Sequence, residues 1–397
     1  MQKSRNWMLK NIIFLGLVSF FADISSEMVY PLIPLYLTAA FGATPVLVGI
    51  VEGIAESIAS LLKVYSGYIS DRYNRKKPLA FLGYASGLLY KLALLFAGSW
   101  LGILGARVID RFGKGIRTAP RDVMVADSAD ATRMGQAFGI HKALDMAGSA
   151  IGILLAYLIV QRVGNGAYKE VFAISIIPVL FALAMFAFVQ EKRETREPKP
   201  REHFWKNARY LDRNLKLYLL VAFIFSLGNS SNAFLLLRAN ELGFTSAEVI
   251  LFYFIYNITA AVIASPFGKL SDRIGRKKLL IAGYATFALV YFGFAFATAK
   301  WVIIGMFVLY GLYTAMVTGV ERAFIVEIAP PQWKGTMLGL LSTLVGIALL
   351  PASVIAGVLW NTVGSFAPFT LGALLSLTAA VLLGFRFRPE PRLQDAV

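Results

Sequence analysis

Long apolar segments alternate with short polar connections along the whole chain. A helix needs about 20 apolar residues to cross the hydrocarbon core of a membrane. The pattern predicts twelve such segments, at residues 11–38, 45–69, 78–98, 100–121, 136–161, 168–190, 217–240, 247–270, 279–298, 300–322, 335–360 and 366–386. We therefore expect an all-α membrane protein with twelve transmembrane helices.

The composition supports this fold class and excludes several kinds of site. The chain has 397 residues, of which 57% are hydrophobic and 16% are charged, whereas a soluble protein carries about 25% charged residues. It contains no cysteine and two histidines, His141 and His203, so disulfides, cysteine-bound metals and a histidine-rich metal site are excluded. We expect no metal and no cofactor.

The distribution of basic residues predicts the orientation. Lysine and arginine gather in the connections at residues 71–78, 121–135, 191–216, 272–278 and 330–335. Cytoplasmic connections are enriched in these residues, so this side is expected to be cytoplasmic, with both termini. The net charge of +16 then follows from topology and implies no nucleic-acid partner. We expect a monomer in contact with membrane lipids, in a bacterial inner membrane.

An internal repeat divides the chain. GYISDRYNRKK at 67–77 recurs as GKLSDRIGRKK at 268–278, and a second pair of similar stretches lies at 121–139 and 321–339. Residues 191–216 form the one long polar connection in the sequence, with prolines at 198 and 200. We expect two pseudo-symmetric six-helix bundles, residues 1–190 and 217–397, joined by a charged cytoplasmic linker at 191–216.

The repeated stretch resembles the loop between helices 2 and 3 of the major facilitator superfamily of secondary transporters, whose pattern is G-x-x-x-D-R-x-G-R-R/K. The resemblance implies the fold of that family, with two bundles that rock about a central path and a cytoplasmic gate at this loop. A plain basic loop is the alternative. The matching residues are Gly67, Asp71, Arg72, Arg75 and Lys76 in the first copy, and Gly268, Asp272, Arg273, Gly275 and Arg276 in the second.

Charged residues inside the predicted membrane segments are concentrated in the first half. A charge at mid-membrane costs at least ~2.5–3.5 kcal/mol, so such residues usually face a cavity and have a function. The proposed proton-coupling residues are Asp23, Glu27, Glu56 and Asp110. The proposed substrate-binding residues are Arg107, Arg111, Lys114, His141, Asp145, Asn229, Asn232 and Asn257.

Each of these assignments has an alternative. Arg107, Arg111 and Lys114 recur at helical spacing and form one stripe, which either binds an anionic group or neutralises the acids of neighbouring helices. Asp23 and Glu27 either exchange protons or form fixed salt bridges, because the proton affinity of a buried carboxylate depends on its surroundings. The asparagines either bind the substrate or join helices to one another.

The leading hypothesis is a proton-coupled secondary transporter that moves a small amphipathic organic molecule by alternating access. Efflux is preferred by analogy with compact exporters, although Ile153 replaces a proline that antiporters of the family often carry. The second hypothesis is a transporter of organic anions or metabolites, including uptake, that uses the basic stripe. A membrane enzyme or a nucleotide-driven pump is disfavoured, because the sequence has neither a catalytic motif nor a Walker-type loop.

Overall fold

The computed structural model describes residues 2–73, 76–129, 134–164, 166–191, 212–330 and 334–387, and within this part of the chain the long regular elements are all α-helices. Eleven of its helical stretches are long and apolar enough to cross a membrane. The helix α5 (Trp100–Asp127) has the required length but carries the charged stripe, and it completes the predicted set of twelve.

Two of the six spans of the first half are interrupted. The first span ends its helix α1 at Val29 and resumes as α2 after Tyr30 and Pro31, because proline cannot continue a helical hydrogen-bond ladder. The sixth span is interrupted at Ser175. The helices are α1 (Gln2–Val29), α2 (Leu32–Phe41), α3 (Pro45–Tyr73), α4 (Lys76–Phe96), α5 (Trp100–Asp127), α6 (Met134–Val163), α7 (Tyr168–Ile174) and α8 (Ile176–Ala187).

The second half repeats this arrangement, with an interruption of its first span at residues 229–232. The chain turns there at Asn229, Ser230, Ser231 and Asn232, whose short polar side chains compete with the helical ladder. The helices are α10 (Arg213–Gly228), α11 (Ala233–Glu241), α12 (Ser246–Ile274), α13 (Arg276–Phe296), α14 (Lys300–Ile328), α15 (Lys334–Thr362) and α16 (Phe366–Arg386). The expectation of two six-helix halves is confirmed.

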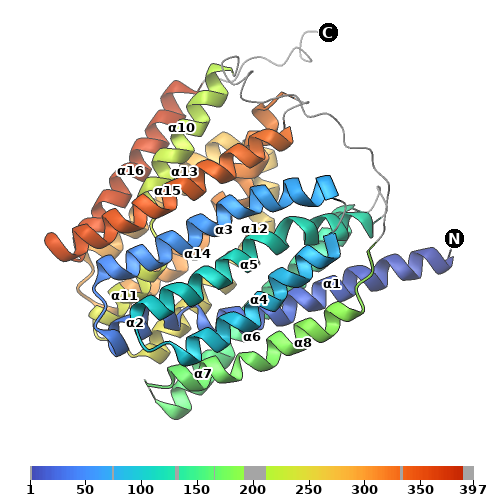
Figure 1. Ribbon diagram of the computed structural model, residues 1–397. Coiled ribbons are helices and arrows are strands. Elements are labelled where there is room, and N and C mark those ends of the chain that lie inside the picture. Colours follow the sequence, from blue (N-terminus) through green and yellow to red (C-terminus); the bar gives the residue numbers. More distant parts are fainter. Residues whose placement is uncertain are drawn as a thin grey trace, which may run out of the picture.

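The two halves pack through α3 and α15 and through α6 and α12 (Figure 1). We call the end of the molecule where α8 ends and α10 begins the linker end, and the opposite end, where α2 and α11 end, the distal end. A side chain at Gly49 of α3 would collide with the carbonyl oxygen of Ser353 in α15. Ser57 of α3 donates a hydrogen bond to the carbonyl oxygen of Gly346 at 2.7 Å. Small residues therefore let the halves approach closely along the distal part of α3.

The repeat is visible in the helix bounds, with one change of register. The end of α3 at Tyr73 corresponds to the end of α12 at Ile274, but the start of α4 at Lys76 corresponds to the start of α13 at Arg276. In the second copy Gly275 makes the turn between α12 and α13 with φ of 92°, a conformation that residues with a Cβ rarely adopt.

Candidate functional site

A network of five charged side chains joins α3 to α5, which we call the α3–α5 network: Glu52, Glu56, Arg107, Asp110 and Arg111. Arg107 binds Glu52 through two contacts, Nε to Oε1 at 2.9 Å and Nη2 to Oε2 at 2.6 Å, and each residue is 1% exposed. Arg111 binds Glu56 at 2.8 Å. Both arginines of the predicted stripe are thus neutralised by carboxylates of the second span.

Asp110 lies between the two arginines at longer distances. Its Oδ2 is 3.5 Å from Arg107 Nη1 and 3.7 Å from Arg111 Nε. The side chain of Lys91, from α4, is fully buried nearby and lies 4.1 Å above the ring of Tyr90. Among the described residues, neither Lys91 Nζ nor the Tyr90 hydroxyl has a hydrogen-bond partner.

The acids of α1 face Lys114 of α5. Lys114 is close enough to both Asp23 and Glu27 to attract their carboxylates. Glu27 also accepts a hydrogen bond from the hydroxyl of Tyr253 in α12 at 3.3 Å, and the rings of Tyr30 and Tyr253 are 5.5 Å apart. Glu27 therefore connects the charges of the first half to the second half.

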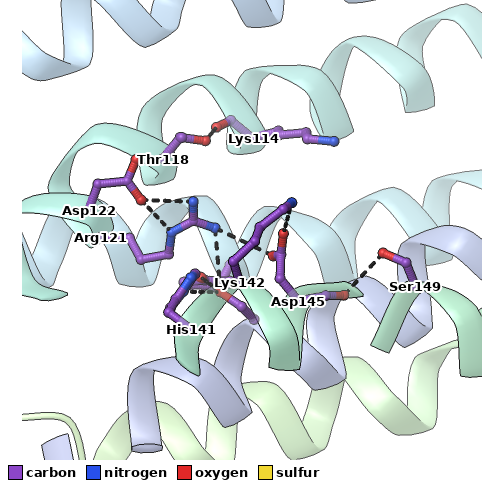
Figure 2. Close-up of polar contacts among 10 residues, drawn as sticks. Lys114, Thr118, Arg121, Asp122, His141, Lys142, Asp145 and Ser149 are labelled. Atoms are coloured by element: carbon purple, nitrogen blue, oxygen red, sulfur yellow. Dashed lines mark hydrogen bonds and ion pairs between the residues drawn. The ribbon is translucent and has the colours of Figure 1, made fainter. Parts of the chain in front are cut away.

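A second group of charges surrounds Asp145 of α6, which we call the Asp145 cluster: Arg121, Asp122, His141, Lys142 and Asp145. Figure 2 shows Arg121 from α5 and Lys142 from α6 converging on the Asp145 carboxylate, at 4.0 Å and 2.7 Å. Arg121 also binds Asp122 at 2.8 Å.

Asp23 and His141 extend this cluster towards α1. The carboxyl group of Asp23 lies within hydrogen-bonding reach of the Asp145 carboxyl. The Nε2 atom of His141 is 3.0 Å from Ser19 Oγ, and Ser19 Oγ is also 3.0 Å from the Tyr84 hydroxyl. His141 is 4% exposed, so its ring is held inside the first half.

The asparagines of the second half are held by tyrosines and by the backbone. Asn229 donates to the Tyr313 hydroxyl at 3.1 Å, and the Tyr310 hydroxyl donates to Asn232 at 2.7 Å. Asn257 donates to the carbonyl oxygen of its own helix at residue 253, at 2.8 Å. Asn229 and Asn232 thus lie at the break between α10 and α11 against an aromatic surface, while Asn257 caps a backbone carbonyl within α12.

The repeated loop motif forms equivalent contacts in the two halves. Lys76 binds Asp127 at the end of α5, and Arg276 binds Glu327 at the end of α14 at 2.9 Å. Arg276 also binds Asp272 at 3.1 Å. By these contacts, the residue of the second copy that is equivalent to Lys76 is Arg276. Alignment of the motif letters instead pairs Lys76 with Lys277. Other motif residues have side chains outside the described part of the chain: Gly67, Asp71, Arg72 and Arg75.

Of the remaining motif residues in the second copy, Arg273 is exposed near the end of α12 and Gly268 lies one turn before Asp272. Two tyrosines complete the site, Tyr30 and Tyr253, and sequence reasoning missed the first of them. The ring of Tyr30 lies 5.3 Å from the Arg107 guanidinium and 5.5 Å from that of Arg111. Tyr253 reaches Glu27 from the other half. The dipeptide Tyr30–Pro31 inside an apolar segment was the available signal for the first of them.

The comparisons with known proteins agree with this architecture. The sequence model described as Major Facilitator Superfamily matches residues 15–237 and 218–396. An uncharacterized MFS-type transporter of Methanocaldococcus jannaschii is 36% identical over 385 residues, which cover 95% of this chain and 94% of the relative. The fosmidomycin resistance protein of Escherichia coli is 27% identical over 310 residues, which cover 74% of each protein.

Solved structures show the same fold. The nucleoside transporter NupG superposes with a TM-score of 0.79 at 12% identity, covering 95% of this chain and 98% of that one. The human organic anion transporter MFSD10 superposes with a TM-score of 0.67 at 17% identity, covering 95% of this chain and 99% of that one. At such low identities these structures support the fold alone.

Proposed function

The chain belongs to the Major Facilitator Superfamily, and from this premise we propose that it is a proton-coupled secondary transporter. It moves a small amphipathic organic molecule across the membrane by alternating access. The observation that carries the proposal is the close approach of two half-buried carboxyl groups, Asp23 of α1 and Asp145 of α6.

Two carboxyl groups in contact support a proton site because two carboxylates at that distance repel each other, and a hydrogen bond between them requires one proton. Asp145 is also bound by Lys142 at 2.7 Å and approached by Arg121 at 4.0 Å. These cations favour the charged form of Asp145, so the shared proton is assigned to Asp23.

Glu27 supplies the link between proton binding and movement. Its hydrogen bond from Tyr253 crosses from the second half to the first, so a rotation of one half against the other changes the surroundings of its carboxyl group. Lys114 lies near both Glu27 and Asp23, and we propose that the two acids exchange protons with water as this connection opens and closes.

For Arg107 we prefer the second role considered for the arginine stripe, which is to neutralise the acids of neighbouring helices rather than to bind an anion. Arg107 is 1% exposed and bound by Glu52 through both contacts. Such a guanidinium has no free edge for a ligand, so we assign Arg107 to holding α3 against α5. The substrate-binding roles of Lys114, Asn229 and Asn232 stay in the proposal, and Glu56 and Asp110 are assigned to neutralising the arginines.

Topology and gating complete the proposal. From the excess of Lys and Arg we propose that the linker end and both termini lie in the cytoplasm. We also propose that residues 1–190 and 217–397 act as two bodies joined by the linker 191–216. Lys76 with Asp127 and Arg276 with Glu327 brace the loop motif of each half at that end. We propose a monomer in a bacterial inner membrane, surrounded by lipid.

Two candidate directions and substrate classes follow from the relatives. The fosmidomycin resistance protein favours efflux of a small organic compound. An organic-anion or metabolite transporter, including uptake, is the second candidate, and it is favoured by the exposed Lys114 of α5 and by the fold of the organic anion transporter MFSD10.

The test uses purified protein in liposomes that contain a trapped pH indicator. Matched sets of amphipathic cations, zwitterions and anions are added outside, and the internal pH is followed. At least one compound is expected to drive a proton flux with wild-type protein and none with Asp23→Asn. Glu170→Gln, an acid-to-amide change at an exposed site on α7, is the matched control. Compound uptake without any proton flux would contradict the proposal.

A further inference from the structure

We propose that the hydroxyl group of Ser19 is a positioning group for the proton site. It holds the side chain of Arg121 away from Asp145 and thereby sets the pH at which Asp23 and Asp145 release their shared proton. This inference rests on the proposed proton coupling and names a residue that regulates it. Ser19 lies in α1, one helical turn before Asp23, and it acts through its contacts rather than through a charge.

Side chains from four helices meet at this hydroxyl. The oxygen of Ser19 in α1 is 3.0 Å from the hydroxyl of Tyr84 in α4 and 3.0 Å from Nε2 of His141 in α6. Arg121 of α5 donates to the same oxygen from Nη1 at 3.4 Å. Ser19, Tyr84 and His141 are all buried. Since buried polar groups need hydrogen-bond partners within the protein, these side chains satisfy one another.

The hydrogen-bonding capacity of Ser19 is fully used. A serine hydroxyl donates one hydrogen bond and accepts two. A guanidinium group can only donate, so Arg121 occupies one of the two acceptor positions. Tyr84 and His141 then share the other acceptor position and the single hydrogen. The hydroxyl therefore fixes all three side chains relative to one another.

One nitrogen of Arg121 lies between Ser19 and Asp145. Nε and Nη2 of Arg121 both donate to Oδ1 of Asp122, at 3.0 and 2.8 Å. The third nitrogen, Nη1, is 3.4 Å from the Ser19 oxygen and 4.0 Å from Oδ1 of Asp145. Figure 2 shows Arg121 and Asp145 facing each other in this arrangement. The guanidinium attracts the carboxylate at this distance but forms no hydrogen bond with it.

The two cations near Asp145 differ in their exposure to water. Lys142 binds the other carboxylate oxygen, Oδ2, at 2.7 Å, and its side chain is 65% exposed. The side chain of Arg121 is 16% exposed. Water screens the attraction of an exposed charge more than that of a buried one. A small displacement of Arg121 therefore changes the attraction on the carboxyl pair more than an equal displacement of Lys142.

Loss of the Ser19 hydroxyl leaves Asp145 as the acceptor that Nη1 can reach while Arg121 stays bound to Asp122. A closer cation favours the fully ionised pair, so the shared proton should be released at a lower pH. A move of about 1 Å, at an effective dielectric constant of about 20, corresponds to a shift of about one pH unit. The charged and titratable groups around the pair are Tyr84 of α4, Lys114, Arg117, Arg121 and Asp122 of α5, and His141 and Lys142 of α6.

The test follows the protonated carboxyl group of the pair by infrared spectroscopy of the full chain in detergent. The band of interest is the carboxyl C=O band that Asp23→Asn removes, and it is titrated against pH. In Ser19→Ala the band should disappear at a pH about one unit lower than in the wild type. Ser19→Thr keeps the hydroxyl and should titrate as the wild type does. In an Arg121→Gln background, Ser19→Ala should cause no further shift, because the group that it releases is absent.

Ser25→Ala is the matched control. Ser25 is also a serine of α1 that is 1% exposed, and its hydroxyl donates to the carbonyl oxygen of Ser175 at 2.6 Å. Its replacement removes a buried hydrogen bond of the same helix, so it should lower the apparent Tm without moving the titration of the carboxyl band. A general loosening of α1 would instead shift the titration in both alanine variants.

Four results would overturn the proposal. They are a Ser19→Ala titration at the wild-type pH or above it, an equal shift in Ser25→Ala, an equal shift in Ser19→Thr, and a shift that persists in the Arg121→Gln background. Failure of the proposed function gives a different result: the band titrates as described, but no compound drives a proton flux in liposomes. If Asp23→Asn removes no band from the wild-type spectrum, the two acids share no proton and both proposals are wrong.

Discussion

Arg107 of α5 and Glu52 of α3 form a two-point ion pair, with N–O distances of 2.9 and 2.6 Å, in which each residue is 1% exposed. The pair joins the second and fourth spans inside the first half. It also lies beside Tyr30, whose ring is 5.3 Å from the Arg107 guanidinium. A helix that carries so many charges can therefore remain inside the membrane because its neighbours neutralise it.

Removing one partner of this pair should destabilise the protein strongly. Glu52→Gln leaves a buried guanidinium without its carboxylate, and the expected loss is about 3–5 kcal/mol in the free energy of unfolding. The double variant Glu52→Leu with Arg107→Met should recover most of the loss, because no charge is then left uncompensated. The apparent Tm in detergent measures both. A single variant as stable as the wild type would refute the structural role of the pair.

The two ion pairs that brace the repeated loop motif, Lys76 with Asp127 and Arg276 with Glu327, should differ in strength. The side chains of Lys76 and Asp127 are 8% and 11% exposed, whereas those of Arg276 and Glu327 are 29% and 31% exposed. Ion pairs accessible to solvent are worth about 0–1 kcal/mol, so Glu327→Gln should change the apparent Tm little and Asp127→Asn clearly more. Equal changes of the apparent Tm in the two variants would show that burial does not determine the strength of these ion pairs.

The close packing of α3 on α15 should control which conformation is populated. Gly49→Val places a side chain where the carbonyl oxygen of Ser353 lies, so the halves cannot meet as they do here. Because the chain has no cysteine, Ser57→Cys, at a site 8% exposed, reports on this interface through its labelling rate.

Labelling at residue 57 should become severalfold faster when Gly49→Val is added. Gly98→Val is the control, because a side chain there would have nothing within 4 Å. If Gly49→Val left the labelling rate of Ser57→Cys unchanged, the distal contact between α3 and α15 would not limit the movement of the halves.

Much of the fold could be predicted from the hydrophobic pattern. Twelve segments, two halves and the repeat follow from the sequence because a membrane imposes one length and one composition on each span. The breaks at Tyr30–Pro31 and at 229–232 were not predicted, since a break of two to four residues hardly changes the mean hydropathy of a long segment.

The site was predicted as a set of residues but not as a set of partners. Helical spacing placed Arg107, Arg111 and Lys114 on one stripe, and the structure keeps them on one side of α5. Helical spacing alone does not show which carboxylate binds which cation, because that depends on how α3 packs against α5. Arg107 and Arg111 form ion pairs with carboxylates of α3, whereas Lys114 forms no ion pair within 4.0 Å among the described residues.

The central claim is that ligand binding is coupled to a proton held by Asp23 and Asp145. The most direct measurement mixes the detergent-solubilised protein with a compound that drives proton flux in the liposome assay, in weakly buffered solution, and follows a pH indicator. Wild-type protein should take up or release about one proton for each ligand bound, as expected for two linked sites. Asp23→Asn should bind the ligand with clearly less proton exchange, because Glu27 is then the one of the two proposed proton-exchanging acids that remains. If wild-type protein binds the ligand without any change in pH, or if Asp23→Asn exchanges protons as the wild type does, the claim is wrong.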